Sequence, residues 1–309
     1  MNIVILGGMG FLGRNLVAFL TRQANQRITV FDRLPLDHDA VKTLPTSVNY
    51  VQGEFVTGFD FTRIVHNADL IIHLVSTSVP GTEQGVIDEI NANVIPSTEL
   101  FQACVQEGVG RILFMSSGGT VYGASNKHKN SETDLPDPIN TYGLQKIMIE
   151  QALHLAVRNS ATDYQIVRLS NPYGPGQNPH GALGLVTKLV YQALNHDTIH
   201  IFGDGSVVRD FIYIDDAIQA IGDIVEHGDM NATYNVGRGI GTSVADVVNT
   251  IDAVLPERLN IVHTPGRAVD VPYSVLNIDK YHRISSIKEF VSLEEGIKRT
   301  YDFFKEHRQ

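Results

Sequence analysis

The chain has 309 residues, of which 43% are hydrophobic and 19% charged, and a formal net charge of −10 at pH 7. This length accommodates one large α/β domain with a smaller lobe, and the acidic balance argues against nucleic acid as a partner. The single cysteine, Cys104, excludes an internal disulfide, and we expect it to be a buried thiol in a helix. The first apolar run, residues 3–6, is too short for a membrane span or a signal peptide, so we expect a cytoplasmic protein without membrane contacts.

Short apolar runs alternate with helix-period segments through the first half of the chain. This alternation predicts βαβ units around a parallel sheet. Strands are predicted at residues 2–6, 28–31, 48–52, 70–74, 111–116 and 163–169. Helices are predicted at residues 11–22, 61–65, 87–107 and 140–158. Pro96 predicts a kink or a break within the third of these helices, because proline lacks the N–H that a helix interior needs.

The pattern changes after Leu169, where residues 171–179 contain three prolines and two glycines and are predicted to form a loop. The remaining predicted elements are helices at 183–194, 215–226, 244–255 and 293–304, strands at 199–202 and 207–214, and an extended segment at 261–271. The chain is predicted to return to the first domain between residues 210 and 235. The fold class is therefore α/β, a Rossmann-like doubly wound parallel sheet with a smaller, discontinuous C-terminal lobe.

A glycine-rich turn joins the first predicted strand to the first predicted helix. Gly7 permits the tight turn, Gly10 lets the backbone approach a pyrophosphate, and Gly13 lets the helix pack closely on the sheet. The pyrophosphate would lie at the positive end of the helix. Asp32 ends the second strand, where a carboxylate accepts hydrogen bonds from the adenosine ribose and favours NAD over NADP. Arg33 follows directly and could instead hold a 2′-phosphate of NADP. The simpler alternative for the three glycines is a strand–helix turn that binds no ligand.

The second motif is Tyr142 and Lys146, which lie four residues apart and therefore on one face of a helix. A neighbouring ammonium stabilises a phenolate, so Tyr142 could take a hydroxyl proton while a hydride leaves for the dinucleotide. Tyr301 and Lys305 repeat the spacing, and we expect that pair to lie on a solvated helix face. Placement separates the two pairs, because Tyr142 follows a strand that ends in the polar segment 116–123, and ligands bind at the carboxyl ends of parallel strands.

With these residues, the chain resembles the extended short-chain dehydrogenase/reductase family, in its nucleotide-sugar epimerase/dehydratase branch. The resemblance covers nearly the whole length and rests on ordered matches at 7–13, Asp32, 73–76, Asn93, 116–123, 142–146, 168–174, 203–210, 234–237 and 267–270. It implies an NAD-binding domain formed by residues 1–169 and about 209–236, and a substrate lobe formed by 170–208 and 237–309. It also implies a homodimer built from the helices near 87–107 and 140–158.

The resemblance implies a set of site residues. The cofactor-binding residues would be Gly7, Gly10, Phe11, Leu12, Gly13, Asp32, Arg33, Glu54, Leu74, Val75, Ser76, Asn93, Ser116, Tyr142 and Lys146. The substrate-binding residues would be Ser117, Gly118, Thr120, Asn171, Arg209, Arg267 and Asp270. Tyr142 would be the general base and Lys146 its partner.

Several of these residues have simpler alternatives. Asn171 could be a turn residue, Arg209 could form a local ion pair with Asp210, and Arg267 could be a surface charge. His73 ends an apolar strand, and a structural role is favoured over a catalytic one. The other histidines show no spacing with acids or with cysteine that is typical of a metal site, so no metal is expected.

The chain departs from many relatives at Gly118, where they carry a Ser or Thr that relays the substrate proton to the tyrosine. Thr120 is our first candidate for the missing hydroxyl and Ser117 the second; otherwise Tyr142 acts directly on the sugar. The 4,6-dehydratases of this branch have an acidic pair just after that Ser or Thr, whereas this chain has glycines at 118 and 119. A dehydratase is therefore disfavoured.

The leading hypothesis is an NAD-dependent nucleotide-sugar 4-epimerase that acts on UDP-hexoses such as UDP-glucose and UDP-galactose. Tyr142 would remove the C4 hydroxyl proton while hydride passes to NAD. The 4-keto sugar would then present its other face, and hydride and proton would return to give the C4 epimer. The alternative is a nucleotide 4-ketosugar reductase that uses NADH or NADPH in one direction. A third possibility, a dinucleotide-binding redox sensor without catalysis, is disfavoured by the intact Tyr142 and Lys146.

Overall fold

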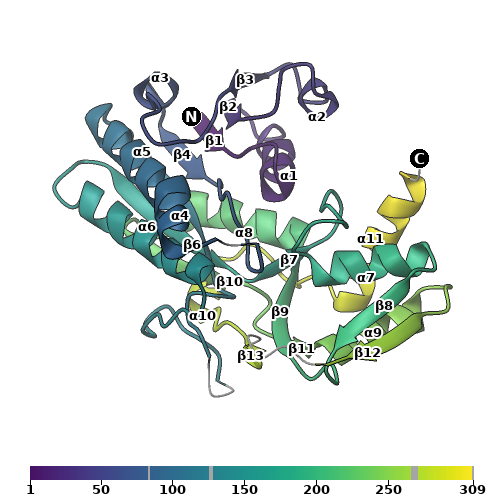
Figure 1. Ribbon diagram of the computed structural model, residues 1–309. Coiled ribbons are helices and arrows are strands. Elements are labelled where there is room, and N and C mark those ends of the chain that lie inside the picture. The colour runs from purple at the N-terminus through teal and green to yellow at the C-terminus, as the bar shows by residue number, and fades with distance from the viewer. Residues whose placement is uncertain (83, 125–127, 266–270, 308–309) are drawn as a thin grey trace.

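The computed structural model describes residues 1–82, 84–124, 128–265 and 271–307, and its largest element is a seven-stranded sheet (Figure 1). All strand pairs are parallel, in the order β10-β6-β5-β4-β1-β2-β3. The strands are β1 (Asn2–Leu6), β2 (Arg27–Asp32), β3 (Val48–Gln52), β4 (Leu70–His73), β5 (Arg111–Ser117), β6 (Asp163–Leu169) and β10 (Ala232–Val236). The predicted doubly wound α/β fold is confirmed, because the strand order reverses between β1 and β4.

Helices cover both faces of this sheet (Figure 1). Alternate side chains of a strand point to opposite faces, so Ile3 and Ile5 join the core under α1 and α8, whereas Val4 and Leu6 join the core under α3, α5 and α6. These helices are α1 (Phe11–Leu20), α3 (Thr62–Val65), α5 (Ile95–Gln106), α6 (Thr141–Val157) and α8 (Ile214–His227). Cys104 is buried in α5, as expected, and burial raises the pKa of its thiol.

The single helix predicted over residues 87–107 is divided. The structure has α4 (Val86–Glu89), a π-helical turn η1 (Ile90–Val94) and then α5. Pro96 lies in the first turn of α5, where its missing N–H costs nothing, so the predicted break falls just before the proline. Because π-helical turns are often found at functional sites, the segment around η1 is relevant to the site described below.

A smaller lobe packs against the carboxyl edge of the large sheet (Figure 1). It contains a sheet in which β9 pairs with β7, β11 and β13, and a second sheet in which β8 pairs with β12. Its strands are β7 (Asn171–Tyr173), β8 (Thr198–Phe202), β9 (Val208–Tyr213), β11 (Gly241–Ser243), β12 (Asn260–Thr264) and β13 (Tyr273–Ser274). The remaining helices are α2 (Asp39–Lys42), α7 (Leu185–Leu194), α9 (Val244–Val254), α10 (Asp279–His282) and α11 (Leu293–Glu306).

Two expectations in this half of the chain are wrong. The loop predicted from residue 171 begins with β7, because the backbone of Asn171–Tyr173 pairs with β9 despite the proline and glycine content. Tyr301 does not lie on a solvated face: it is 7% exposed, and its hydroxyl donates to Glu257 Oε1 at 2.6 Å. Among the residues that the structure describes, every helix is too short or too polar to cross a bilayer.

Candidate active site

The glycine turn lies between β1 and α1 at the carboxyl edge of the sheet. Gly7 has φ +78°, which favours glycine, and its N–H donates to Phe31 O at 2.9 Å. A Cβ on Gly13 would lie 2.5 Å from Gly7 O and 2.6 Å from Gly8 C, so only glycine lets the helix approach the turn. Gly10 is exposed at the start of α1, where the helix dipole favours an anion. This cradle fits the pyrophosphate of a dinucleotide.

Asp32, at the end of β2, supports this turn directly. Its Oδ2 accepts a hydrogen bond from the Met9 N–H at 2.9 Å, and its Oδ1 accepts from the Leu34 N–H at 3.4 Å. The carboxylate is partly exposed, so it can still meet a ribose hydroxyl. Arg33 directly follows β2, Glu54 lies two residues after the end of β3, and both residues are exposed.

The segment after β4 lies against the glycine turn, because a Cβ on Gly7 would lie 3.2 Å from the Val75 backbone nitrogen. Leu74, Val75 and Ser76 are partly buried there. Asn93, which is 2% exposed in η1, holds this segment: its Oδ1 accepts from the Thr77 N–H at 2.9 Å. In this structure Asn93 supports the segment that follows β4.

Tyr142 and Lys146 both lie on the buried face of α6, 9% and 3% exposed. Asn140 caps this helix, because its side-chain oxygen accepts from the Gly143 N–H at 2.8 Å. The Lys146 Nζ donates to Met115 O at 3.1 Å and lies 5.6 Å from the centre of the Tyr142 ring. The sequence therefore places the pair correctly on one face, and β5 supplies the carbonyl that holds the ammonium.

Burial dominates the proton affinities of the pair. It raises the pKa of Tyr142 well above the ordinary tyrosine value; a hydrogen bond with Ser76 opposes this rise, and the charge of Glu89 adds to it. Burial also lowers the pKa of Lys146 to about 8, against the nearby charges of Glu150 and Glu89. A cationic dinucleotide bound beside the phenol would favour its ionised form.

A buried ion pair lies on the inner face of α6, one turn beyond Lys146. Arg168 on β6 donates to both carboxylate oxygens of Glu150, at 3.1 and 2.7 Å. The Ser116 hydroxyl donates to the same carboxylate at 2.5 Å, which gives this predicted cofactor-binding residue a structural partner. Arg168 also donates to Tyr122 Oη at 2.9 Å, and Tyr122 donates to Asn235 on β10 at 2.7 Å. Burial raises the pKa of Tyr122 to about 12.

The glycine at 118 is required by packing. A Cβ there would lie 2.6 Å from Leu276 Cδ1 and 2.9 Å from Arg168 O, so a Ser or Thr has no room. The neighbouring Gly119 has open space, with Asn171 Nδ2 nearest at 3.8 Å. Packing against Leu276 and the Arg168 carbonyl is therefore the structural reason for a glycine at position 118.

Thr120 and Asn171 lie close to this glycine pair. A Cβ on Gly143 would lie 2.6 Å from Thr120 O, which places Thr120 against the first turn of α6. The Thr120 hydroxyl oxygen is enclosed and has no hydrogen-bond partner among the described residues. Ser117 is partly exposed at the end of β5. The Asn171 side chain donates to Asp210 O at 3.0 Å, which joins β7 to β9.

The structure describes one of the two arginines that were predicted to bind the diphosphate, Arg209. Arg209 is partly buried on β9 and donates to Val271 O at 2.6 Å. The adjacent Asp210 is 1% exposed; burial raises its pKa to about 6, although the N–H groups of Arg238, Leu276 and Gly239 lower it. Arg267 and Asp270 lie outside the described residues.

His73 has the structural environment that the sequence favoured. It is fully buried between Phe55 and Phe114, and its Nε2 lies 2.9 Å from Ser97 Oγ. Burial, together with the charge of Lys146, lowers the pKa of His73 to about 3, so the ring is neutral. Within the described part of the chain, no three His, Cys, Asp or Glu side chains are grouped so that they could hold a metal ion.

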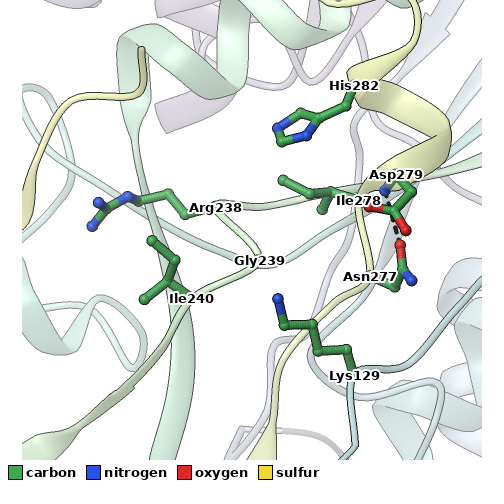
Figure 2. Close-up of a pocket in the computed structure, with 8 residues that line it drawn as sticks. All are labelled: Lys129, Arg238, Gly239, Ile240, Asn277, Ile278, Asp279 and His282. Atoms are coloured by element: carbon green, nitrogen blue, oxygen red, sulfur yellow. Dashed lines mark hydrogen bonds between the residues drawn. The ribbon is translucent and has the colours of Figure 1, made fainter.

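A separate surface pocket of about 250 Å³ lies beside the smaller lobe, and Figure 2 shows the residues that line it. The Lys129 amine and the His282 ring point into it, whereas the Arg238 side chain points away. None of the described residues predicted for the site lines this pocket. Residues 276–278 face both regions, because Leu276 packs on Gly118 while Asn277 and Ile278 line the pocket.

Sequence reasoning missed the buried polar residues that support the pair. Glu150 could have been noticed, because it lies four residues after Lys146 and so on the same helix face. Glu89 and Gln145, which are 3% and 1% exposed, gave no such signal. Their importance depends on contacts between α4, α6 and the segment after β4.

A dinucleotide cradle and a buried Tyr–Lys pair at the carboxyl edge of a parallel sheet define a short-chain dehydrogenase/reductase of the extended type. The chain belongs to the NAD dependent epimerase/dehydratase family, whose pattern matches residues 3–237, and its cofactor is NAD.

Individual relatives include both epimerases and a reductase. The solved structure of UDP-glucose 4-epimerase from Thermotoga maritima, with UDP-glucose, superposes with a TM-score of 0.91 and is 31% identical over 100% of both chains. UDP-glucose 4-epimerase from Mycolicibacterium smegmatis is 28% identical over 100% of both chains. The dTDP-4-dehydro-6-deoxyglucose reductase from Escherichia coli is 28% identical over 96% of each chain.

The glycine turn yields a prediction that separates cofactor binding from folding. Gly13→Ala should lower the unfolding free energy by about 2–4 kcal/mol, because its Cβ meets backbone atoms that cannot move away. Gly10→Ala, whose Cβ would lie 3.3 Å from Gly7 O, should keep stability near that of the parent but lose bound NAD. Chemical denaturation and the absorbance of released NAD measure the two effects. Equal destabilisation by both variants would contradict this division of roles.

A second prediction concerns the glycines at 118 and 119. Gly118→Ser should destabilise the protein by about 1–3 kcal/mol and reduce activity, because the new side chain displaces Leu276. Gly119→Ala is the matched control and should change stability by less than about 0.5 kcal/mol. Thermal unfolding of both variants tests this. A stable and more active Gly118→Ser variant would show instead that the missing hydroxyl limits catalysis.

Proposed function

We propose that this protein is an NAD-dependent nucleotide-sugar 4-epimerase of the UDP-glucose/UDP-galactose type. The observation that carries the proposal is the buried Tyr142–Lys146 pair beside the glycine segment 118–119, which has no acid for the elimination of water. The epimerase relatives, one of them solved with UDP-glucose, support the same assignment.

In this mechanism Tyr142 takes the proton of the C4 hydroxyl and later returns it to the C4 oxygen, after the sugar has turned its other face to the hydride donor. Lys146 stabilises the phenolate by its charge and is itself held by Met115 O. NAD held at the turn of Gly7, Gly10 and Gly13 would supply the acceptor and donor of the C4 hydride. Thr120, whose hydroxyl is enclosed and unpartnered among the described residues, is the proposed donor to the sugar hydroxyl, with Ser117 as the alternative.

The sugar must turn over between the two half-reactions while the nucleotide stays fixed. We propose that Asn171 and Arg209, together with Arg267 and Asp270, hold the nucleotide and diphosphate from the smaller lobe. The sheet around β9 would then form the substrate lobe, and the large sheet with β10 would form the NAD-binding domain. A cytoplasmic location is part of the same proposal, since the lone thiol of Cys104 is buried and requires no oxidising compartment.

One observation favours a second candidate, a nucleotide 4-ketosugar reductase. The reductase from Escherichia coli matches nearly the whole chain at the same identity as the epimerase from Mycolicibacterium smegmatis. A reductase would use Tyr142 as a proton donor in one direction and exchange its cofactor after each turnover. Retention of NAD through purification therefore distinguishes the two functions.

The deciding experiment incubates the purified protein with UDP-galactose and no added cofactor, and follows UDP-glucose by proton NMR. We expect conversion by the parent and a loss on the order of 100- to 10 000-fold in Tyr142→Phe, because general acid–base catalysis contributes that much. Tyr301→Phe is the matched control and should retain activity, because its hydroxyl bonds Glu257 away from the site. Cofactor-free protein that reduces 4-ketosugars with NADH, but does not convert UDP-galactose, would identify the reductase.

We also propose that the protein is a homodimer that pairs through α4–α5 and α6. Ile87 on α4 and Leu155 on α6 are 70% and 69% exposed, and a subunit interface on these neighbouring helices would cover both side chains. Leu155→Glu should convert the dimer into monomers in light scattering, because it buries a charge in the interface. Leu36→Glu, at a site 62% exposed after β2, should leave the dimer intact. A monomeric parent protein would contradict the proposal.

A further inference from the structure

A buried carboxylate faces the catalytic pair without a cationic partner. Glu89, at the end of α4, is 3% exposed. Among the described residues, no Lys, Arg or His lies within 4.0 Å of its oxygens. An unpaired buried carboxylate is costly, so its retention next to a reactive site calls for a role beyond packing.

Hydrogen bonds connect Glu89 to both sides of the site. Its Oε2 accepts from Ser78 Oγ at 2.7 Å and from Asn93 Nδ2 at 3.0 Å, and its Oε1 accepts from the Gln84 N–H at 3.1 Å. Gln145, which lies on α6 directly before Lys146, donates to Ser78 Oγ at 3.0 Å. The carboxylate is thus held in one orientation by three neutral donors, and Ser78 links it to the catalytic helix.

The same arrangement fixes the hydroxyl that contacts the catalytic phenol. Ser76 donates to Ser78 O at 2.8 Å, and the Ser76 side chain interacts with the Tyr142 phenol and lowers its pKa. Because Ser78 is held by Glu89, the position of Ser76 depends on the carboxylate. Glu89 therefore acts on Tyr142 in two ways, through this chain of contacts and through its charge.

Among the described residues, two other ionisable groups face Lys146, and neither of them has an unpaired charge. Glu150 also faces Lys146 from α6, but its charge is matched by the two hydrogen bonds from Arg168 on β6. His73 faces Lys146 from β4 and is held neutral by burial. Glu89 is thus the described carboxylate near the pair whose charge is not offset by an ion pair.

We propose that Glu89 is a positioning residue that sets the pH at which Tyr142 can accept a proton and that holds Ser76 against it. This inference rests on the proposed role of Tyr142 in proton transfer. A negative charge opposes the formation of a second one nearby, so Glu89 prevents ionisation of the phenol until a cationic ligand is bound. It also favours the charged form of Lys146.

The test compares three variants by the pH dependence of kcat/KM on the holoenzyme. Glu89→Gln should move the acid limb of the profile down by about one pH unit, because a unit charge is removed from a buried site. Asp88→Asn removes the neighbouring, exposed carboxylate and should leave the profile unchanged. Ser78→Ala removes a donor to Glu89 without changing any charge. It should move the acid limb to higher pH, because a less firmly held Ser76 no longer lowers the pKa of Tyr142.

A second readout needs no sugar substrate. Carbon NMR of ring-labelled tyrosine, with the Tyr142 signal assigned from Tyr142→Phe, follows ionisation of this phenol in protein with retained NAD. The same opposite shifts in Glu89→Gln and Ser78→Ala are expected there, and they would support the inference even if the sugar specificity were misassigned.

Either of two results would overturn the inference. One is a Glu89→Gln enzyme with reduced kcat but an unchanged acid limb, which is the mark of a purely structural residue. The other is a shift of equal size in Asp88→Asn. If Glu89→Gln does not fold, Ser78→Ala still tests the inference, and the absence of an alkaline shift in that variant overturns the inference. Glu89→Asp keeps the charge and should therefore retain the parental pH midpoint.

Discussion

The hydrogen bond from the Lys146 ammonium to the carbonyl of Met115 is the interaction on which the site depends. It fixes a buried cation where helix α6 crosses strand β5, and it thereby orients the Tyr142 ring on the same helix face. A buried ammonium is tolerated only if it is hydrogen-bonded and opposed by negative charge. The nearby carboxylates of Glu150 and Glu89 supply that negative charge.

The two carboxylates solve the same electrostatic problem differently. Glu150 belongs to a continuous polar chain through Arg168 and Tyr122 to Asn235, so it connects α6 with the edge strand β10. Within the described part of the chain, Glu89 accepts hydrogen bonds only from neutral donors and forms no salt bridge. One carboxylate therefore stabilises the architecture, and the other is free to influence the proton affinity of Tyr142.

Several features of the site were predictable because they depend on local rules. The glycine turn follows from the position of Gly7, Gly10 and Gly13 between a strand and a helix, and the Tyr142–Lys146 face follows from helical periodicity. The strands of the first half were predicted within two residues of their ends. The misjudged elements, β7 and the surroundings of Tyr301, are those where pairing with β9 or packing against Glu257 overrides the local composition.

The sequence by itself determined the α/β class, the glycine turn after the first strand and the shared helix face of Tyr142 and Lys146, because each depends on residue types at fixed short spacings. Only the tertiary structure decided why position 118 must be glycine, since Leu276 and the Arg168 carbonyl, far away in the chain, occupy the space of a side chain there. It also decided that Glu89 lies near the pair without forming a salt bridge to any residue that the structure describes. Burial and charge compensation arise from contacts between distant segments, and no local pattern encodes them.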